Sequence, residues 1–257
     1  MIEFIQTGES LAGTPLLFLH GLGGDATNWL PQLDGLGRHR RCIAWTMPGY
    51  GTSPADGLES FESLTAEAVG LLDQLNCEQV SVVGLSMGGY VAQQMALDFP
   101  DRVDRLVLAA TTAAFGKPGS TFNEEFLGSR LAALDAGATP ASIAEGLVDG
   151  LLGSNPDPAA RANAVASMRR IQPDAYRQAL QTLVTWNISD RLAEITQPVL
   201  ALAGAEDGTA PERAMSRMVD GLGNATLQVI QDSGHLINLE KPDEFNLAVQ
   251  TFLEIDS

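Results

Sequence analysis

The sequence predicts an α/β protein whose mostly parallel sheet carries helices on both faces and is interrupted once by a block of helices. Short apolar runs alternate with helix-like stretches along most of the chain. Continuous apolar strands are typical of a parallel sheet covered on both sides, because neither face meets water. Between residues 113 and 190 no convincing strand pattern occurs, and this stretch predicts the block of helices.

The individual elements follow from the same alternation. The apolar runs expected to form strands lie at residues 16–20, 42–46, 79–84, 105–110, 199–203 and 226–231. Helical patterns lie between them, near residues 27–37, 61–76, 87–98, 211–221 and 241–255. The opening segment, with Ile2 and Phe4 ahead of a glycine-containing turn, is expected to add antiparallel strands at the sheet edge.

The block of helices lies between two expected strands. Its stretches FNEEFLGSRLAALDAG, TPASIAEGLVDGLLG, PAARANAVASMRRI and PDAYRQALQTLVTW have helix-like patterns, and glycines and prolines separate them. Because the strand pattern resumes near residue 198, we expect an insertion into one core rather than a separate domain. The expected organisation is a core of residues 1–112 and 191–257, with a helical cap of residues 113–190 over one end of the sheet.

Composition limits the classes of function. The chain has 257 residues, of which 45% are hydrophobic and 18% charged, enough for a sizeable core in one larger α/β domain. Its formal charge of −17 argues against a nucleic-acid partner, because phosphate binding needs basic patches. No apolar run reaches the length of about 20 residues that spans a membrane, and no secretory signal is visible. We therefore expect a cytoplasmic protein without a membrane partner, in which Cys42 and Cys77 are reduced core thiols.

One serine, Ser86, stands where an apolar run passes into a helical pattern, in VSVVGLSMGGYVAQQM (residues 80–95). A strand that turns sharply into a helix holds the residue at the turn in a strained conformation with its side chain outward. The residues two places before and after must then be small, and Gly84 and Gly88 stand there. Helix capping is the alternative, but Gly89 stands where a capping box would place glutamate or glutamine. The pattern therefore indicates a nucleophile at the carboxyl end of a strand, where open sheets bind ligands.

A serine nucleophile needs a base and a third group that orients the base. Among the three histidines, His235 follows a strand pattern and precedes the last helix, whereas His39 is expected to be an exposed loop residue among charges in GRHRRC. Asp207, after the strand in VLALAGAEDGTAP, is the preferred acid, and Glu206 and Asp232 remain alternatives. The acid and the base are expected to meet the serine, because the carboxyl ends of parallel strands share one edge of the sheet.

A glycine-rich turn follows the first long apolar run, in LLFLHGLGGDATNW. Such a turn can present a backbone N–H to the oxyanion of acyl transfer, and we expect the amides of Leu22 and Met87 to be the two donors. Phosphate binding is the alternative use of such glycines, but neither GxxxxGK[ST] nor GxGxxG occurs here. His20, in the same turn, is expected to shape the loop rather than to act in the chemistry.

The pieces HGLGG, PGYGTS, GLSMGG, AGAEDGTAP and SGHLINLEKPDEFN occur in this order along essentially the whole chain. Together they resemble the α/β-hydrolase superfamily, whose triad runs in the order serine, acid, histidine. Within it the chain is most similar to 3-oxoadipate enol-lactonases, through the AQ after the elbow, the segment HLINLEKPDEFN and the cap opening FLGSRLAALDAG. In WTMPGYGTS, Thr46 and Met47 depart from the superfamily's DxRGxGxS turn. The resemblance implies an α/β-hydrolase fold with the cap inserted before the strand that carries the acid.

The resemblance also implies a reaction. We expect a serine hydrolase that cleaves a carboxylic ester or lactone, of the 3-oxoadipate enol-lactone kind, through an acyl-enzyme and without a metal or organic cofactor. The alternatives are a general carboxylesterase, a carbon–carbon bond hydrolase of aromatic catabolism, and a ligand-sensing receptor with a vestigial triad. A small molecule is the expected partner, and the sequence predicts no particular oligomeric state.

The pocket is expected to draw on the glycine-rich turn and on the cap. Its candidate residues are His20, Phe126, Arg130 and Trp186. Phe122 or Phe126 stands where a tryptophan is expected near the start of an enol-lactonase cap. Among the cap arginines, Arg130, Arg169 and Arg170 are candidates to pair with a substrate carboxylate.

Overall fold

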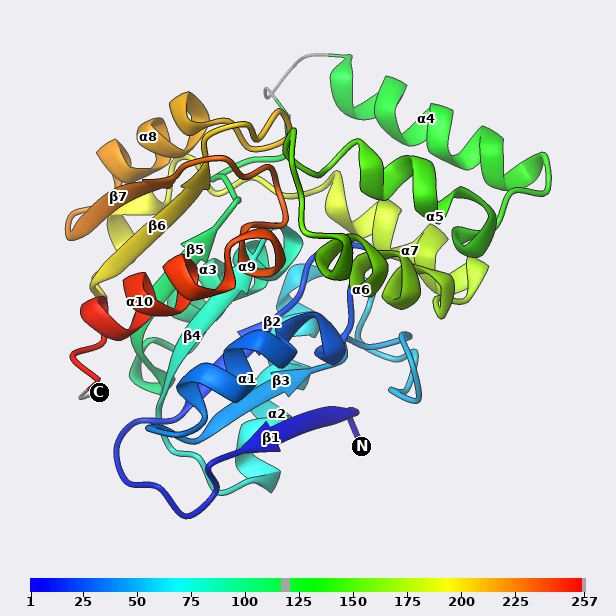
Figure 1. Cartoon of the computed structure of the whole chain (residues 1–257). Helices are drawn as coiled ribbons and strands as arrows, with labels where there is room; N and C mark the ends of the chain where they lie inside the picture. Colours follow the sequence, from blue (N-terminus) through cyan, green and yellow to red (C-terminus); the bar gives the residue numbers. More distant parts are fainter. Residues whose placement is uncertain (117–120, 256–257) are drawn as a thin grey trace.

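The computed structural model describes residues 1–116 and 121–255, which fold around one seven-stranded sheet (Figure 1). The strand order is β1-β3-β2-β4-β5-β6-β7. The strands are β1 (Phe4–Thr7), β2 (Leu16–Leu19), β3 (Cys42–Trp45), β4 (Val80–Leu85), β5 (Val103–Ala109), β6 (Val199–Gly204) and β7 (Ala225–Ile230). Every neighbouring pair is parallel except β1 with β3. The predicted mostly parallel sheet with an antiparallel edge is therefore confirmed.

The register of the sheet brings the turns that follow five of its strands to one edge. The central strand β4 pairs with β2 up to Leu19 and Gly84, and with β5 up to Leu85 and Ala109. On the far side of β5, β6 pairs with β7 up to Gly204. The turns after β2, β4, β5, β6 and β7 consequently open at the same, carboxyl edge of the sheet.

Helices cover both faces of the sheet. One face carries α1 (Leu30–Leu36), α9 (Ile237–Glu240) and α10 (Pro242–Phe252); the other carries α2 (Phe61–Gln74), α3 (Met87–Asp98) and α8 (Glu212–Gly221). Short 3-10 helices are η1 (Ala26–Trp29), η2 (Pro100–Arg102) and η3 (Leu192–Glu194). Within the described ranges, no helix combines the length and the apolar character needed to cross a membrane.

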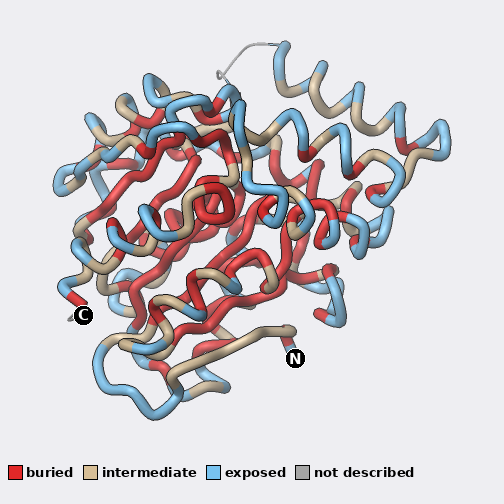
Figure 2. The backbone as a smooth tube through the Cα atoms, in the orientation of Figure 1, coloured by how far each residue is buried: buried red, intermediate tan, exposed pale blue. Residues whose placement is uncertain are grey.

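Alternate side chains of each strand fill two separate cores. From β2, Leu17 and Leu19 join the core beneath α2 and α3, whereas Leu16 and Phe18 join the core beneath α1 and α10. Successive side chains of a strand point to opposite faces, so a sheet buried on both faces needs apolar residues at every position. Figure 2 shows the result as a continuous buried layer through the middle of the molecule.

Four helices are inserted between β5 and β6. They are α4 (Phe122–Asp135), α5 (Pro140–Asp149), α6 (Pro158–Arg169) and α7 (Pro173–Leu183). Figure 1 shows them gathered beyond one end of the sheet, with α4 outermost. The side chain of Asn163 in α6 donates to the carbonyl of Thr27 in η1, which follows the turn after β2, so these helices adjoin the carboxyl edge. Residues 117–120 of the expected insertion lie outside the described part of the chain.

Two expected details of the sequence pattern differ in the structure. The helix expected over residues 241–255 is α10, which begins at Pro242 and ends at Phe252, and a short helix that was not expected, α9, precedes it; Lys241 between them has non-helical φ and ψ values of −135° and 61°. Proline lacks a backbone N–H and fits the first helical position better than a helix interior. The pattern at residues 27–37 opens with a 3-10 turn before α1. Cys42 and Cys77 are both buried free thiols, as predicted.

Candidate active site

Ser86 occupies the turn between β4 and α3 in a strained conformation, with φ 53° and ψ −119°. Positive φ is uncommon outside glycine and persists only where the surroundings enforce it. The backbone N–H of Ser86 donates to Ala109 O at 2.9 Å. Its carbonyl accepts from the N–H of Gly89 and from Thr111 Oγ1, each at 2.8 Å. These bonds to β5, its following turn and the first turn of α3 hold the serine in place while its side chain stays half-exposed.

The small residues around Ser86 are required by close backbone approach. A Cβ added at Gly84 would stand 2.7 Å from Gly89 Cα, and one added at Gly88 would stand 2.7 Å from the carbonyl oxygen of His20. Neither distance is tolerated without movement of the backbone. The glycines therefore let α3 start directly against β4 and against the turn after β2.

An acid–base pair stands at the same edge. His235 Nδ1 lies 2.8 Å from Asp207 Oδ2, and both side chains are buried. The other oxygen of Asp207 accepts from the backbone N–H groups of Thr209 and Ala210 at 2.7 and 3.0 Å. Burial opposes the ionisation of Asp207, but the hydrogen bonds from His235, Ala210 and Thr209 outweigh it and hold the pKa of this carboxyl below its usual value.

The alternative acids and base lie elsewhere. Glu206 accepts hydrogen bonds from the backbone and hydroxyl of Ser154, and Asp232 is exposed on a left-handed turn with φ 51°. His39 lies in the turn between α1 and β3, which is at the amino edge of the sheet. It is half-buried rather than exposed as expected, and its backbone N–H donates to Leu36 O at the end of α1, which folds the turn back against that helix end.

The two expected oxyanion donors lie on adjoining turns. Leu22 is in the turn after β2 and Met87 is the first residue of α3. Within the described residues neither backbone N–H has a hydrogen-bond partner. An N–H at the first position of a helix has no intrahelical acceptor, so the one at Met87 is available to an oxyanion.

His20 fixes the turn after β2. Its ring is buried, with Nδ1 2.8 Å from Gly21 O, and Nε2 accepts from the backbone N–H of Met47 at 3.0 Å. This pattern requires a neutral ring protonated on Nδ1, and burial lowers the pKa of His20 to about 4. Thr46, one residue before Met47, accepts from the N–H of Ala26 at 3.2 Å and so also ties this turn to β3.

The aromatic pocket candidates pack against other aromatic rings. Trp186 is buried, stacks on Tyr90 of α3 at 5.1 Å between ring centroids, and donates to the carbonyl of Thr112. Tyr90 is one helical turn from Ser86, so Trp186 is close to the elbow but within the core. Phe126 packs on Phe115 at 5.0 Å, at the half-buried base of α4.

The three candidate arginines within residues 113–190 divide into two kinds. Arg169 pairs with Glu145, and Arg170 pairs with Asp25. Arg130 instead lies over the ring of Phe126 and lines a groove of about 430 Å³ among α4, α5 and α7, beside Tyr176. Arg169 and Arg170 are thus each paired with a carboxylate of this chain, whereas Arg130 lines a groove.

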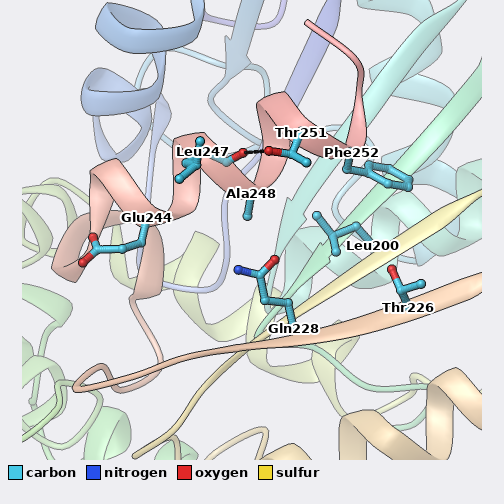
Figure 3. Close-up of a pocket in the computed structure, with 8 residues that line it drawn as sticks. All are labelled: Leu200, Thr226, Gln228, Glu244, Leu247, Ala248, Thr251 and Phe252. Atoms are coloured by element: carbon cyan, nitrogen blue, oxygen red, sulfur yellow. Dashed lines mark hydrogen bonds between the residues drawn. The ribbon is translucent and has the colours of Figure 1, made fainter.

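The structure does not join every member of the predicted triad. Among the described residues no hydrogen bond links Ser86 Oγ to the ring of His235; the two share the carboxyl edge of the sheet. Hydrogen bonds between a nucleophile and its base are often long until substrate binds. A separate hollow of about 450 Å³ lies between α10 and strands β6 and β7, and Figure 3 shows the residues that line it. Leu200 and Thr226, which line it, stand near the amino ends of their strands, away from the carboxyl edge where Ser86, Asp207 and His235 lie.

Glu240 is a buried residue of this region that the sequence analysis missed. It accepts hydrogen bonds from the backbone on either side of His235 and from the link between α5 and α6. Its partners are backbone groups of two other segments, which no side-chain pattern reveals. The one available signal was a glutamate in a short apolar stretch directly after His235.

Comparisons with known proteins agree with this architecture. Residues 14–242 match the family model for the alpha/beta hydrolase fold. A Caulobacter protein named "Putative carbamate hydrolase RutD" is 33% identical over 91% of this chain and 88% of its own length. The 3-oxoadipate enol-lactonase 2 of Acinetobacter baylyi is 24% identical over 93% of this chain and 88% of its own length.

A solved structure has the same fold as this chain. The thermophilic esterase of Thermogutta terrifontis is 27% identical, with a TM-score of 0.87 over 98% of this chain and 93% of that one. The resemblance to the α/β-hydrolase superfamily, enol-lactonases included, is confirmed. The chain belongs to the alpha/beta hydrolase fold family and is a hydrolase.

Proposed function

We propose that this hydrolase cleaves a carboxylic ester or lactone through a covalent acyl-enzyme on Ser86. The observation that carries the proposal is the buried Asp207–His235 pair at the edge of the sheet where the strained turn presents Ser86. A serine hydroxyl is a weak nucleophile on its own, and a histidine held by a carboxylate is the arrangement that activates it.

In the first half-reaction, Ser86 Oγ attacks the carbonyl carbon while His235 Nε2 takes the hydroxyl proton. Asp207 accepts from Nδ1–H, fixes the tautomer and stabilises the imidazolium that forms. The carbonyl oxygen becomes an oxyanion and accepts hydrogen bonds from the amides of Leu22 and Met87. One such donor is typically worth about 2.7–4 kcal/mol in the transition state. The carbon–oxygen bond of the ester then breaks, and His235 returns the proton to the leaving oxygen.

In the second half-reaction, His235 removes a proton from water, which attacks the acyl carbon. The Ser86 ester bond breaks, the proton returns to Oγ, and a carboxylic acid leaves. For an enol-lactone the leaving group of the first half-reaction is an enolate that stays tethered to the acyl chain. Both half-reactions use His235 as the base, and in both the amides of Leu22 and Met87 donate hydrogen bonds to the oxyanion.

We further propose that residues 113–190 form a cap that shapes the substrate pocket, and that the substrate resembles 3-oxoadipate enol-lactone from aromatic catabolism. The enol-lactonase relative supports this choice. Arg130 supports it as well, because it faces a groove among the inserted helices and could pair with a substrate carboxylate. His20, Phe126 and Trp186 remain the other proposed pocket residues, acting through the shape of their surroundings.

Carbamate hydrolysis is a second candidate, favoured by the relative with 33% identity. The chemistry differs in the leaving group, since His235 would protonate a nitrogen rather than an oxygen. The same serine, base and oxyanion donors would serve both reactions.

The deciding experiment compares wild type with Ser86→Ala on 3-oxoadipate enol-lactone, 4-nitrophenyl acetate and a simple carbamate, each followed by absorbance or product release. We expect rapid loss of the lactone by wild type and none above background with Ser86→Ala. Loss of only the carbamate would replace the substrate class while keeping the nucleophile. Normal turnover by folded Ser86→Ala would reject the acyl-enzyme mechanism.

A further inference from the structure

Glu240 is a buried carboxylate whose partners are backbone N–H groups. Its residue is 6% exposed, and no ion-pair partner is found for it within residues 1–116 and 121–255. Oε1 accepts from Gly234 N and Leu236 N, both at 3.1 Å. Oε2 accepts from Gly153 N at 2.7 Å and is 3.2 Å from Gly234 N. A buried carboxylate is costly unless several donors satisfy it, and here the backbone supplies them.

The donors come from two segments that are far apart in the sequence. Gly234 and Leu236 flank His235, whereas Gly153 lies in the link between α5 and α6. The backbone N–H of His235 itself donates to Leu151 O in the same link, at 2.7 Å. We call residues 151–153, residues 234–236 and the Glu240 carboxylate together the histidine clasp.

The clasp depends on close contact between two backbones. A Cβ added at Gly153 would stand 3.0 Å from Gly234 N, and one added at Gly234 would stand 2.5 Å from Leu151 O. Neither Gly153 nor Gly234 can therefore be replaced by a residue with a Cβ unless the backbone moves. A carboxylate that reaches in from α9 satisfies the N–H groups that such an approach would leave without acceptors.

We propose that Glu240 is a positioning residue for His235, and that it acts by locking the loop of His235 to the link between α5 and α6. The proposal rests on the proposed function of His235 as the catalytic base. Asp207 holds only Nδ1 of the ring, so it controls the rotation of the ring but not the location of the backbone that carries it. The clasp holds that backbone on both sides, and a base displaced by about 1 Å can lose about 100-fold in rate.

The first test compares Glu240→Gln with Glu244→Gln, using 4-nitrophenyl acetate. Both variants remove one negative charge, but Glu244 lies exposed on α10 and takes no part in the clasp. In Glu240→Gln the amide NH₂ faces backbone donors in place of one carboxylate oxygen, so we expect kcat to fall about 10- to 100-fold while KM changes less than about threefold. Glu244→Gln should match wild type. A folded Glu240→Gln protein with kcat within twofold of wild type would overturn the proposal.

A second test does not require turnover. The chain has three histidines, so their ring signals can be assigned by nuclear magnetic resonance. In Glu240→Gln we expect the ring signals of His235, including its Nδ1 proton, to shift or broaden, with those of His20 unchanged. Unchanged His235 signals would reject a positioning role. If wild type hydrolyses none of the three substrates, the proposed function fails, and this measurement still decides whether Glu240 holds His235.

Hydrogen exchange on wild type covers the case in which Glu240→Gln does not fold. The amides of Gly153, Gly234 and Leu236 should then be among the protected amides outside the helices and strands, because each donates to a buried carboxylate. Exchange as rapid as that of exposed loop amides would show that the clasp does not hold, and would overturn the proposal.

Discussion

Asp207 uses its two carboxylate oxygens for different purposes. One accepts from the backbone of Thr209 and Ala210, and the other accepts from the ring of His235. In Asp207→Asn, the amide oxygen would keep the backbone bonds and the NH₂ group would face Nδ1. That arrangement favours the ring tautomer protonated on Nε2, which cannot take a proton from Ser86. We expect kcat to fall by about 10⁴.

The matched control for this substitution is Glu206→Gln, which changes the neighbouring carboxyl by the same single atom. Glu206 contacts Ser154 rather than His235, so its variant should retain most of the activity. Steady-state rates on whichever substrate wild type hydrolyses give the comparison. A large loss in Glu206→Gln together with near-normal rates in Asp207→Asn would show that Glu206, and not Asp207, is the acid of the triad.

His20 makes folding stability depend on pH. Burial lowers its pKa from 6.5 to about 4 in the folded protein, so the unfolded chain binds this proton more tightly. The resulting stabilisation is complete above pH 6.5 and is lost as pH falls through 4, and its full size is about 3 kcal/mol. In His20→Gln, whose side-chain oxygen can accept from Met47 N–H, we expect a flatter stability profile over this interval.

Urea unfolding at several pH values between 4 and 7 measures this contribution. The His20→Gln protein is expected to be less stable at pH 7 but to lose about 2–3 kcal/mol less than wild type on acidification. Parallel profiles for the two proteins would show that His20 is not the group that titrates.

Among the elements, those defined by local patterns were predictable and those defined by tertiary partners were not. The central strands form from unbroken apolar runs, and the Ser86 elbow needs Gly84 and Gly88, which are both visible in the local sequence pattern. The burial of Trp186 against Tyr90 was not foreseen, because an aromatic residue after a helix gives no sign of its neighbours. The clasp on Glu240 was missed for the same reason, since its donors are backbone groups.

Helix α6 is fastened to the turn that precedes η1, and the fastening can be tested. Arg170 donates to Asp25 Oδ2 through Nε at 2.9 Å. Burial opposes the ionisation of Asp25, but hydrogen bonds from Thr27 and Arg170 outweigh it and lower the pKa of this carboxyl. Arg170→Met would leave the buried carboxylate with fewer donors, and we expect the free energy of unfolding to fall by about 1 kcal/mol.

The adjacent arginine provides the control. Arg169 pairs with Glu145 where both side chains are more than half exposed, at 52% and 59%. Exposed pairs contribute little, so Arg169→Met should change the unfolding free energy by less than about 0.5 kcal/mol. Equal effects of the two substitutions in urea unfolding would mean that α6 is not held through Asp25.

At the scale of the whole molecule, the common direction of the parallel strands determines where the candidate catalytic residues lie. Ser86, Asp207 and His235 come from three separate turns, and the parallel sheet brings all three to its carboxyl edge. This placement could be predicted from the sequence because it follows from strand direction alone. The substrate could not, because the proposed cap consists of α4–α7, and the packing of these helices depends on tertiary contacts that no local sequence pattern specifies.

The charge of the whole molecule also makes a prediction about substrate capture. With a formal charge of −17, the protein repels anions, and 3-oxoadipate enol-lactone carries a free carboxylate. At an ionic strength near 0.15 M this field is screened beyond about 8 Å, so kcat/KM for the lactone should rise several-fold, on the order of 3- to 10-fold, between low and physiological salt. A neutral ester such as 4-nitrophenyl acetate should show no such rise, which separates substrate capture from effects of salt on folding. A rate that instead falls with salt for the lactone alone would mean that a cation in the pocket outweighs the overall field. Arg130 would then be the residue to replace, because it faces a groove among the inserted helices.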